Sequence, residues 1–224
     1  MSNAEKWRDL RDQLVLATLD QVPFEGWSPR ALQEAAKDLA LDPTIAERLF
    51  PGGALEAIDH FTDLADRRLL EVAAANDLAG MRRSERIRWL IRQRIEAWAG
   101  HRESVRRAVT FLTLPTHGHI AARSSWRTAD TIWYASGDAA TDFSYYTKRA
   151  TVAAVYTGTL LYWLQDDSED FADSWAFLDR RLADALKVTR LRTTVEKRLG
   201  QLPNPVRLFL TRAGEKRRFG IRQV

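Results

Sequence analysis

The sequence predicts an all-α fold, and three observations lead to this expectation. Apolar residues recur at intervals of three and four along most of the 224 residues, no stretch alternates as a half-buried strand does, and proline or glycine separates the candidate helices. A hydrophobic fraction of 45% is ordinary for a globular protein, and a chain of this length can bury a substantial core. The sequence contains no cysteine, which excludes disulfides, thiol catalysis and thiolate metal sites. We expect a bundle of nine or ten helices.

The first 53 residues predict three helices that are bounded by proline, glycine or capping residues. Pro23 is expected to stop the first helix. Ser28 provides an N-cap directly before a proline at the first helical position of the second, and Asp42 does the same for the third. The three expected ranges are 4–22, 29–39 and 43–50. A long helix followed by two short ones within about 50 residues is the layout of a helix-turn-helix.

This N-terminal layout resembles the N-terminal domain of TetR-type repressors, but its charges do not suit DNA. A recognition helix should present cations to phosphate groups, whereas the candidate here offers Glu47 beside Arg48. Leu49 and Gly53 stand where the TetR pattern has a tyrosine and a lysine. We therefore predict that nucleic acid is not a partner and that these helices serve as a packing unit. The resemblance is carried by Ala31, Leu32, Ala35, Ala36 and the run FPGG at 50–53.

Three further helices are expected in the middle of the chain, at 55–78, 84–99 and 105–122, the last with a break at Pro115. The second of them carries many arginines interleaved with glutamates, which favours a solvated face with helical ion pairs. His117 and His119 are two positions apart and would point to different sides of a helix, so no metal site is predicted there. The arginines assigned to the solvated face are Arg82, Arg83, Arg86, Arg88, Arg92 and Arg94.

The run 150–164 has no charged residue and is apolar or small on nearly every face. It is shorter than the roughly 20 residues that span a bilayer, so it predicts a helix buried in protein. Such a helix either forms the centre of the domain or lines an apolar cavity, and Gly158 leaves room for something to approach. The residues expected to line this cavity are Phe111, Leu112, Val152, Val155, Tyr156, Gly158, Leu160, Leu161, Trp163 and Leu164.

Two segments flank the uncharged run. The segment 130–134, DTIWY, is expected to start an element in a charged, turn-rich context, so that Trp133 or Tyr134 should be exposed. The acidic segment 166–170 is not an EF-hand loop, because phenylalanines occupy the positions that need glycine and glutamate; we predict a capping loop with Ser168 or Asp170 as the cap. The helix that follows, 171–199, has an apolar stripe suited to pairing within the chain or across a dimer.

The C-terminal segment concentrates positive charge. Six basic residues and one acidic residue lie between 203 and 224, although the net charge of the whole chain is only +4. A proline-detached helix that is both amphipathic and basic is typical of the membrane interface; a helix docked on its own domain is the alternative. The residues expected to contact an anionic membrane are Val206, Arg207, Phe209, Leu210, Arg212, Lys216, Arg217 and Arg218.

Three segments, 130–150, 155–171 and 173–181, resemble the coenzyme Q biosynthesis accessory family, whose members have TetR-like folds, bind isoprenoid lipid and support quinone-ring hydroxylases. The resemblance implies a lipid tunnel along the uncharged helix, a homodimer, a membrane-contacting last helix and an aromatic surface for a di-iron hydroxylase. The sequence shows no catalytic triad, metal-spaced carboxylate pair or phosphate loop, so we expect a non-enzyme whose only bound group is an isoprenoid lipid or quinone precursor. The hydroxylase surface falls on Asp130, Trp133, Tyr134, Asp138 and Asp142.

These expectations define one function and one alternative. The favoured function is a lipid-binding accessory protein of ubiquinone biosynthesis that presents quinone precursors to a ring hydroxylase at the membrane; the alternative is a TetR-type, ligand-responsive transcriptional regulator. The first residues lack a secretory or organelle-targeting pattern, which predicts a bacterial protein in the cytoplasm, peripheral on the inner face of the cytoplasmic membrane. We expect three divisions of the chain. Residues 1–65 form a helix-turn-helix-like unit, residues 66–200 form a helical core for lipid binding and dimerisation, and residues 201–224 form a linker with an amphipathic membrane-binding helix.

Overall fold

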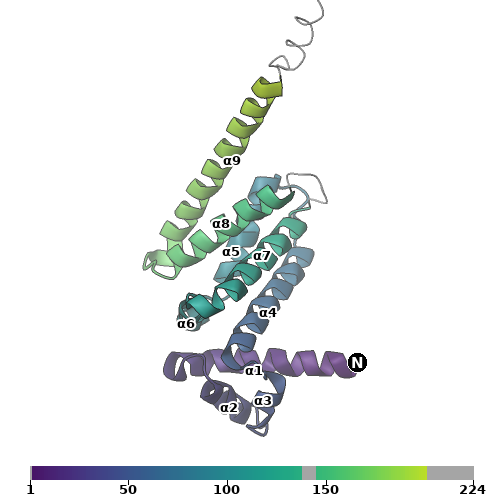
Figure 1. Cartoon of the computed structure of the whole chain (residues 1–224), viewed down its shortest axis with the longest axis vertical. Helices are drawn as coiled ribbons and strands as arrows, with labels where there is room; N and C mark the ends of the chain where they lie inside the picture. Colours follow the sequence, from purple (N-terminus) through teal and green to yellow (C-terminus); the bar gives the residue numbers. More distant parts are fainter. Residues whose placement is uncertain (1, 138–144, 201–224) are drawn as a thin grey trace, which may run out of the picture. The chain divides into compact units, whose positions relative to one another are not determined.

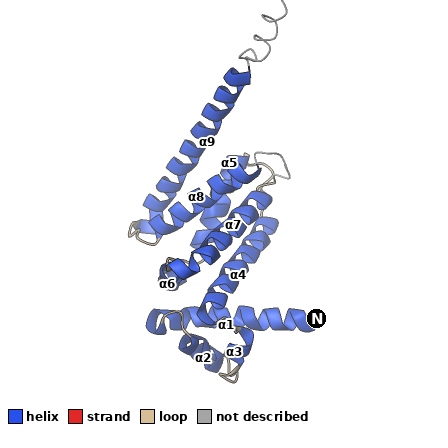
Figure 2. Ribbon diagram, viewed as in Figure 1, coloured by secondary structure: helices blue, strands red, loops and turns tan. Residues whose placement is uncertain are grey.

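A computed structural model describes residues 2–137 and 145–200, with the side chains of 2–137 and 146–187. This part of the chain contains nine α-helices, three short 3₁₀ turns and no strand, so the predicted all-α class is confirmed (Figure 2). None of the helices found within it is both long and apolar enough to cross a membrane. The helices are α1 (Asn3–Glu25), α2 (Pro29–Asp38), α3 (Ile45–Leu49), α4 (Gly53–Ala75), α5 (Arg83–Glu96), α6 (Arg102–Leu112), α7 (Gly118–Ala135), α8 (Tyr145–Trp163) and α9 (Ala172–Gly200).

The chain forms two compact units, residues 1–182 and 183–224. The division falls inside α9, and the boundary expected at residue 65 falls inside α4. The first unit contains α1 to α8 and the start of α9, and it holds every buried side chain discussed below. The amphipathic helix expected after residue 200 lies outside the described residues.

Helix α1 does not stop at Pro23 as the sequence predicted. It runs on to Glu25 and ends at Gly26, whose φ of 65° is readily adopted only by glycine. Because proline has no N–H, the carbonyl of Leu19, four residues earlier, lacks its helical donor. The hydroxyl of Ser104, on α6, donates to that carbonyl at 2.6 Å. The helix therefore tolerates the proline because a side chain from another helix replaces the missing hydrogen bond.

Helices α2 and α3 pack on α1 and complete the N-terminal unit, α1 to α3. The Ser28 hydroxyl accepts from the Ala31 N–H at 3.1 Å, which confirms the predicted N-cap. Asp42 instead accepts from the N–H and the hydroxyl of Thr44, at 2.9 and 2.8 Å, so that α3 begins only at Ile45. The face of α2 that meets α1 is almost fully buried and consists of Ala31, Leu32, Ala35 and Ala36.

Helices α4 to α8 form the second part of the first unit, called the bundle below. Helix α7 lies between α4 and α8 (Figure 1). Pro115 breaks the chain as expected, but it opens a 3₁₀ turn, and α7 begins at Gly118. Consequently the segment 130–134 ends α7 and does not start an element, because the periodicity of 118–135 is continuous through it.

The corner between α8 and α9 is a capping loop, as predicted, but its central residue is Asp166. Its carboxylate accepts four hydrogen bonds, from the backbone and hydroxyl groups of Ser168 and Ser174, at 2.5 to 2.8 Å. Of the two predicted caps, Ser168 is confirmed, because its hydroxyl accepts from the Asp173 N–H at 3.1 Å, whereas Asp170 does not cap the helix. It and Phe171 both adopt positive φ, 51° and 57°, and the carbonyl of Asp170 accepts from the Trp175 indole N–H at 2.9 Å.

Candidate functional site

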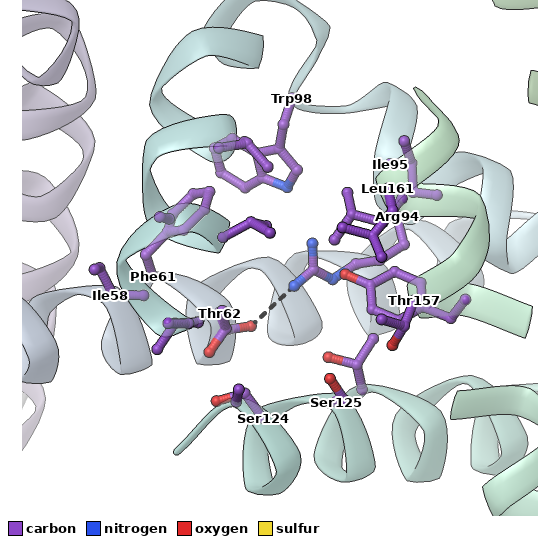
Figure 3. Close-up of a pocket in the computed structure, with 18 of the residues that line it drawn as sticks. Ile58, Phe61, Thr62, Arg94, Ile95, Trp98, Ser124, Ser125, Thr157 and Leu161 are labelled. Atoms are coloured by element: carbon purple, nitrogen blue, oxygen red, sulfur yellow. Dashed lines mark hydrogen bonds between the residues drawn. The ribbon is translucent and has the colours of Figure 1, made fainter. Parts of the chain in front are cut away.

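The bundle encloses a cavity of about 420 Å³ between α4, α5, α6, α7 and α8 (Figure 3). Protein interiors are normally packed with few voids larger than a water molecule, so a space of this size inside a core is unusual. Binding pockets for small molecules range from about 300 to 1,000 Å³. Most of the wall is apolar. Its apolar side chains include Ile58, Phe61, Ile95, Trp98, Val105, Ala108, Val109, Leu112, Ala121, Leu160, Leu161 and Trp163.

Five of the ten residues predicted to line a cavity do line this one: Leu112, Tyr156, Leu160, Leu161 and Trp163. The four from α8 recur at helical spacing and lie on the side of α8 that faces α6 and α7. The uncharged helix therefore has one face on the cavity, other faces packed against protein, and exposed positions at Ala154 and Tyr162. Whether the cavity-lining side chains contact a ligand remains a prediction.

The other five predicted residues lie away from the cavity. Phe111 stacks on the ring of His117, with centroids 4.6 Å apart. Gly158 faces Phe177, which an added Cβ would meet at 3.8 Å, so the space it leaves is filled by α9. Val152, Val155 and Leu164 are buried in the hydrophobic core. Apolar character alone did not distinguish the cavity face of α8 from its packed faces.

No local pattern in the sequence marked the cavity residues from α4 and α5. Ile58, Phe61 and Ile95 repeat at the helical spacing of ordinary core positions, and Trp98 follows the same stripe. A core residue and a cavity-lining residue have the same periodicity in sequence, because both face inward. What distinguishes a cavity-lining residue from a core residue is the distance between the facing helices, and that distance is set only when the bundle assembles.

One end of the cavity is polar, and its central group is Arg94. The sequence placed this arginine on a solvated face, but its side chain is only 6% exposed. Its Nε donates to the Asp66 carboxylate at 2.8 Å, and Nη2 donates to the Thr62 carbonyl at 3.3 Å. Asp66 also accepts from the Thr128 hydroxyl at 2.9 Å. Figure 3 shows the guanidinium pointing into the cavity.

Charge is nearly balanced at this polar end. A buried arginine is stable only when paired, and Asp66 supplies the matching charge. Burial acts to lower the pKa of Arg94, but the charge of Asp66 and its hydrogen bond to the guanidinium hold that pKa up, so Arg94 stays charged. Burial raises the pKa of the Tyr156 hydroxyl, which therefore remains a neutral donor at physiological pH. The Arg94 guanidinium carbon lies 5.9 Å from the centre of the Tyr156 ring.

The opposite end of the cavity opens toward solvent. Three of the lining residues are exposed: Thr113 and Gly118, which flank the turn between α6 and α7, and Leu161 on α8, which is 45% exposed. Thr128, Arg94 and Tyr156 are buried. The cavity therefore has an apolar, partly open end and a buried end that carries hydrogen-bond donors.

Three of the five residues predicted to bind a partner protein lie in the described part of the chain, and their environments differ. Tyr134 is 73% exposed, whereas Trp133 is buried, with the Lys148 amine 5.6 Å from its ring. Trp133 faces inward because the segment is the last turn of α7 and not a turn-rich surface, so of this pair only the tyrosine is available. Asp130 forms an ion pair with Arg149. Asp138 and Asp142 lie outside the described residues.

Three histidines, His60, His101 and His117, have protein partners. His60 is paired with Asp12 at 2.7 Å, and Nδ1 of His117 lies 2.9 Å from the Phe111 carbonyl. No group of three or more potential metal ligands exists in the searched ranges, 2–137 and 145–200. The residues predicted to bind a membrane, Val206 through Arg218, lie beyond the described part of the chain.

Two comparisons with known proteins agree on one family. The COQ9 family model matches residues 119–189, which hold α7, α8 and much of α9. The human mitochondrial ubiquinone biosynthesis protein COQ9 is 31% identical over 191 residues, covering 82% of this chain and 60% of the human protein. The corresponding Drosophila melanogaster protein is 28% identical, covering 84% of this chain and 58% of its own length. The resemblance to the coenzyme Q accessory family is confirmed, and the chain spans about 60% of the length of these relatives.

A solved structure supports the fold. The crystal structure of a TetR transcriptional regulator from Nitrosomonas europaea superposes with a TM-score of 0.64 and 27% sequence identity, covering 80% of this chain and 98% of that one. The predicted TetR-like architecture is therefore confirmed.

The predicted location is contradicted. The human, rat, bovine and fly relatives are all named as mitochondrial proteins, which conflicts with a cytoplasmic protein on the inner face of a bacterial membrane. The prediction rested only on the composition of the first residues. That composition carries no information on location when a chain matches only part of its relatives.

Proposed function

This chain is a homologue of the COQ9 ubiquinone biosynthesis proteins, and on this premise we propose that it is a lipid-binding accessory protein of ubiquinone biosynthesis. It would hold an isoprenoid quinone precursor and present it to a ring hydroxylase at a membrane, without catalysing a reaction itself. The observation that carries the proposal is the 420 Å³ apolar cavity in the bundle.

The size and chemistry of the cavity suit the apolar part of a lipid. Its walls offer aliphatic and aromatic carbon on five helices, and burying apolar ligand surface contributes about 25 cal/mol per Å². The partly open end beside Leu161 gives an apolar chain a way in, and a chain longer than the cavity could extend through it. A polar or charged metabolite would leave most of its groups without partners along this wall.

Mass spectrometry of organic extracts from the purified protein tests this proposal. We expect a co-purified isoprenoid lipid from the wild-type protein and a clear loss of it from Ala121→Phe, which places a ring in the cavity. The matched control is Ala154→Phe, an exposed position on α8 that does not line the cavity. Equal lipid in all three proteins, or none in the wild type, would contradict lipid binding in the cavity.

We propose that the hydroxylase partner contacts the exposed tyrosines near the ends of α7 and α8. Tyr134 is 73% exposed and Tyr146 is 70% exposed, and Tyr146 stacks on Trp126 with centroids 6.2 Å apart. Exposed aromatic residues often dominate the binding energy of interfaces. Tyr134→Ala should weaken binding of a ubiquinone-pathway di-iron hydroxylase at least tenfold. Phe24→Ala on α1, where Phe24 is 83% exposed, is the control and should leave binding unchanged.

We also propose membrane attachment through the basic C-terminal segment and a two-fold dimer through α9. In α9, Trp175 and Leu178 are buried in the first unit, whereas Leu186 is 46% exposed and available for a second copy. Vesicles with anionic lipid should bind the full chain less well as salt rises, and should not bind a chain cut after Gly200. A clean monomer near 25.6 kDa in analytical ultracentrifugation would contradict the dimer.

The similarity to a transcriptional regulator raises an alternative function, and the surface of α3 argues against it. This helix has five residues, exposes Glu47, and holds the Arg48 guanidinium 5.9 Å from the centre of the Trp7 ring. An acidic residue beside a single, already occupied cation is a poor phosphate contact. We expect no specific retardation of DNA in gel-shift assays at physiological salt.

A further inference from the structure

The polar end of the cavity has hydrogen-bond donors that the protein does not use. In the described part of the chain, Arg94 donates through Nε and Nη2, and Nη1 has no protein partner. The hydroxyl of Tyr156, a residue only 6% exposed, likewise has no protein partner among the described residues. Figure 3 shows the Arg94 guanidinium directed into the space, with the indole nitrogen of Trp98 turned toward the same region. These donors face the open space of the cavity, where a ligand or water can satisfy them.

The charges around these donors select the kind of acceptor. Asp66 already neutralises Arg94 at 2.8 Å, and it also lies 3.5 Å from Nε of Arg127. Arg127 also pairs with Asp59 at 3.2 Å, and the partly exposed Arg123 pairs with the same carboxylate at 2.6 Å. A phosphate placed beside Arg94 would bring a second anion next to the buried Asp66 carboxylate, which already neutralises this arginine, and that carries a large desolvation penalty. A neutral oxygen accepts a charge-assisted hydrogen bond without adding charge.

From this arrangement we propose that the cavity binds a lipid head-first. A neutral ring oxygen, such as a quinone carbonyl or phenolic oxygen, accepts from Arg94 and Tyr156, and the apolar chain runs toward the exposed lining residues Thr113 and Gly118. This inference rests on the proposed function, because it names the orientation and head chemistry of the lipid. Its consequence is that the ring is shielded while the lipid is carried. Hydroxylation of the ring then requires the lipid to leave the cavity first.

Three probes that share one geranyl chain separate the head groups: geranyl-1,4-benzoquinone, geranylbenzene and geranyl phosphate. Isothermal titration calorimetry with the full-length protein should give at least tenfold tighter binding of the quinone than of the hydrocarbon, the effect of one or two good hydrogen bonds. Geranyl phosphate should bind more weakly than the quinone. Tighter binding of the phosphate would overturn the neutral-head assignment.

Two variants locate the preference. Tyr156→Phe removes only a hydroxyl and should reduce the quinone preference several-fold while leaving geranylbenzene affinity unchanged. The double variant Arg94→Met with Asp66→Asn removes both charges together, so that no unpaired charge stays buried, and should abolish most of the preference. Tyr162→Phe is the matched control, because Tyr162 lies on the same helix, is 38% exposed and does not line the cavity. Thermal melts followed by circular dichroism confirm that each variant is folded.

The outcomes distinguish this inference from the proposed function. If wild-type protein binds quinone and hydrocarbon equally, or if both variants keep the full preference, the head-first orientation is wrong and lipid binding stands. If the wild type binds neither probe, the proposed function is overturned and the orientation falls with it. If the preference for the quinone over the hydrocarbon is lost in the Tyr156 and Arg94 variants and kept in the control, the ring oxygen binds at Arg94 and Tyr156.

Discussion

The N-terminal unit and the bundle are built from similar helices but use their interiors differently. In α1 and α2 the inward side chains, among them Leu14, Leu19 and Ala36, have no exposed surface and meet across a continuous core. In the bundle, inward side chains such as Phe61 and Leu160 surround a space of about 420 Å³. The same periodicity thus produces a filled core in one region and a lined cavity in the other.

This difference shows where the functional constraint lies. The N-terminal unit keeps the layout of a helix-turn-helix but presents Glu47 on its shortest helix, so its interior serves stability. The bundle accepts a void and the buried pair of Arg94 and Asp66, both of which reduce stability relative to a packed apolar core. Because stability does not require a cavity or a buried ion pair, both features indicate a binding role for the bundle. Four predictions test this difference between the bundle and the packed N-terminal unit.

The largest expected effect is a difference in the free energy of unfolding between alanine variants of two aspartates, one in the bundle and one in the N-terminal unit. Asp66→Ala leaves Arg94 buried without its counter-charge and should lower the free energy of unfolding by about 3–5 kcal/mol. Asp12 joins α1 to α4 through Arg67 at 2.7 Å, but this pair is partly exposed, so Asp12→Ala should cost only about 1–2 kcal/mol. Urea denaturation measures both values. Equal costs would mean that the polar end of the cavity is more hydrated than its burial indicates.

The second contrast is between filling a packed core and filling a cavity. Ala36→Leu in the N-terminal unit forces three carbon atoms into a site with no free space and should cost about 1–3 kcal/mol. Ala108→Leu points into the cavity and should change the free energy of unfolding by less than about 1 kcal/mol. It should also reduce the lipid that co-purifies. A comparable stability loss at both positions would show that the cavity closes in solution.

The third prediction concerns the seam between the two regions. Ser104→Ala removes the donor to the Leu19 carbonyl and should cost about 1–2 kcal/mol. Pro23→Ala restores a backbone N–H at the position that would normally satisfy this carbonyl. In a double-mutant cycle the loss caused by Ser104→Ala should therefore be smaller in the Pro23→Ala background. Additive effects would show that the hydroxyl does not substitute for the missing helical bond.

The smallest expected effect is a pH dependence confined to the α8–α9 corner. Burial acts to raise the pKa of Asp166, but hydrogen bonds from Ser168 and Ser174 lower that pKa to about 2, from 3.8. Because the folded-state pKa is lowered, the stabilisation is present above pH 3.8 and is lost as pH falls toward 2. Asp166→Asn should flatten the acid dependence of the unfolding free energy in this window. Ser28, which caps α2, does not titrate, so Ser28→Ala should shift stability equally at the two ends of the same window.

The sequence predicted the fold more fully than the site, and the reason is the range of the interactions. Ser28 before Pro29 and the uncharged run at 150–164 are local signals, and they located α2 and α8. Arg94 looked like one of several solvated arginines, because its partner Asp66 is 28 positions away on another helix. Pro23 looked like a helix stop, because the serine that compensates for it lies 81 positions later. Pairings of this kind depend on the assembled bundle.

The chain reversal at Asp170 and Phe171 has a practical consequence for protein engineering. Two consecutive non-glycine residues with positive φ are unfavourable by about 1–3 kcal/mol each. The contact that Asp170 makes with Trp175 uses its backbone carbonyl, and its side chain is exposed. A glycine at position 170 would keep that contact and adopt the same backbone conformation without steric cost. Asp170→Gly is therefore a rational first substitution for raising the stability of the protein without altering the cavity.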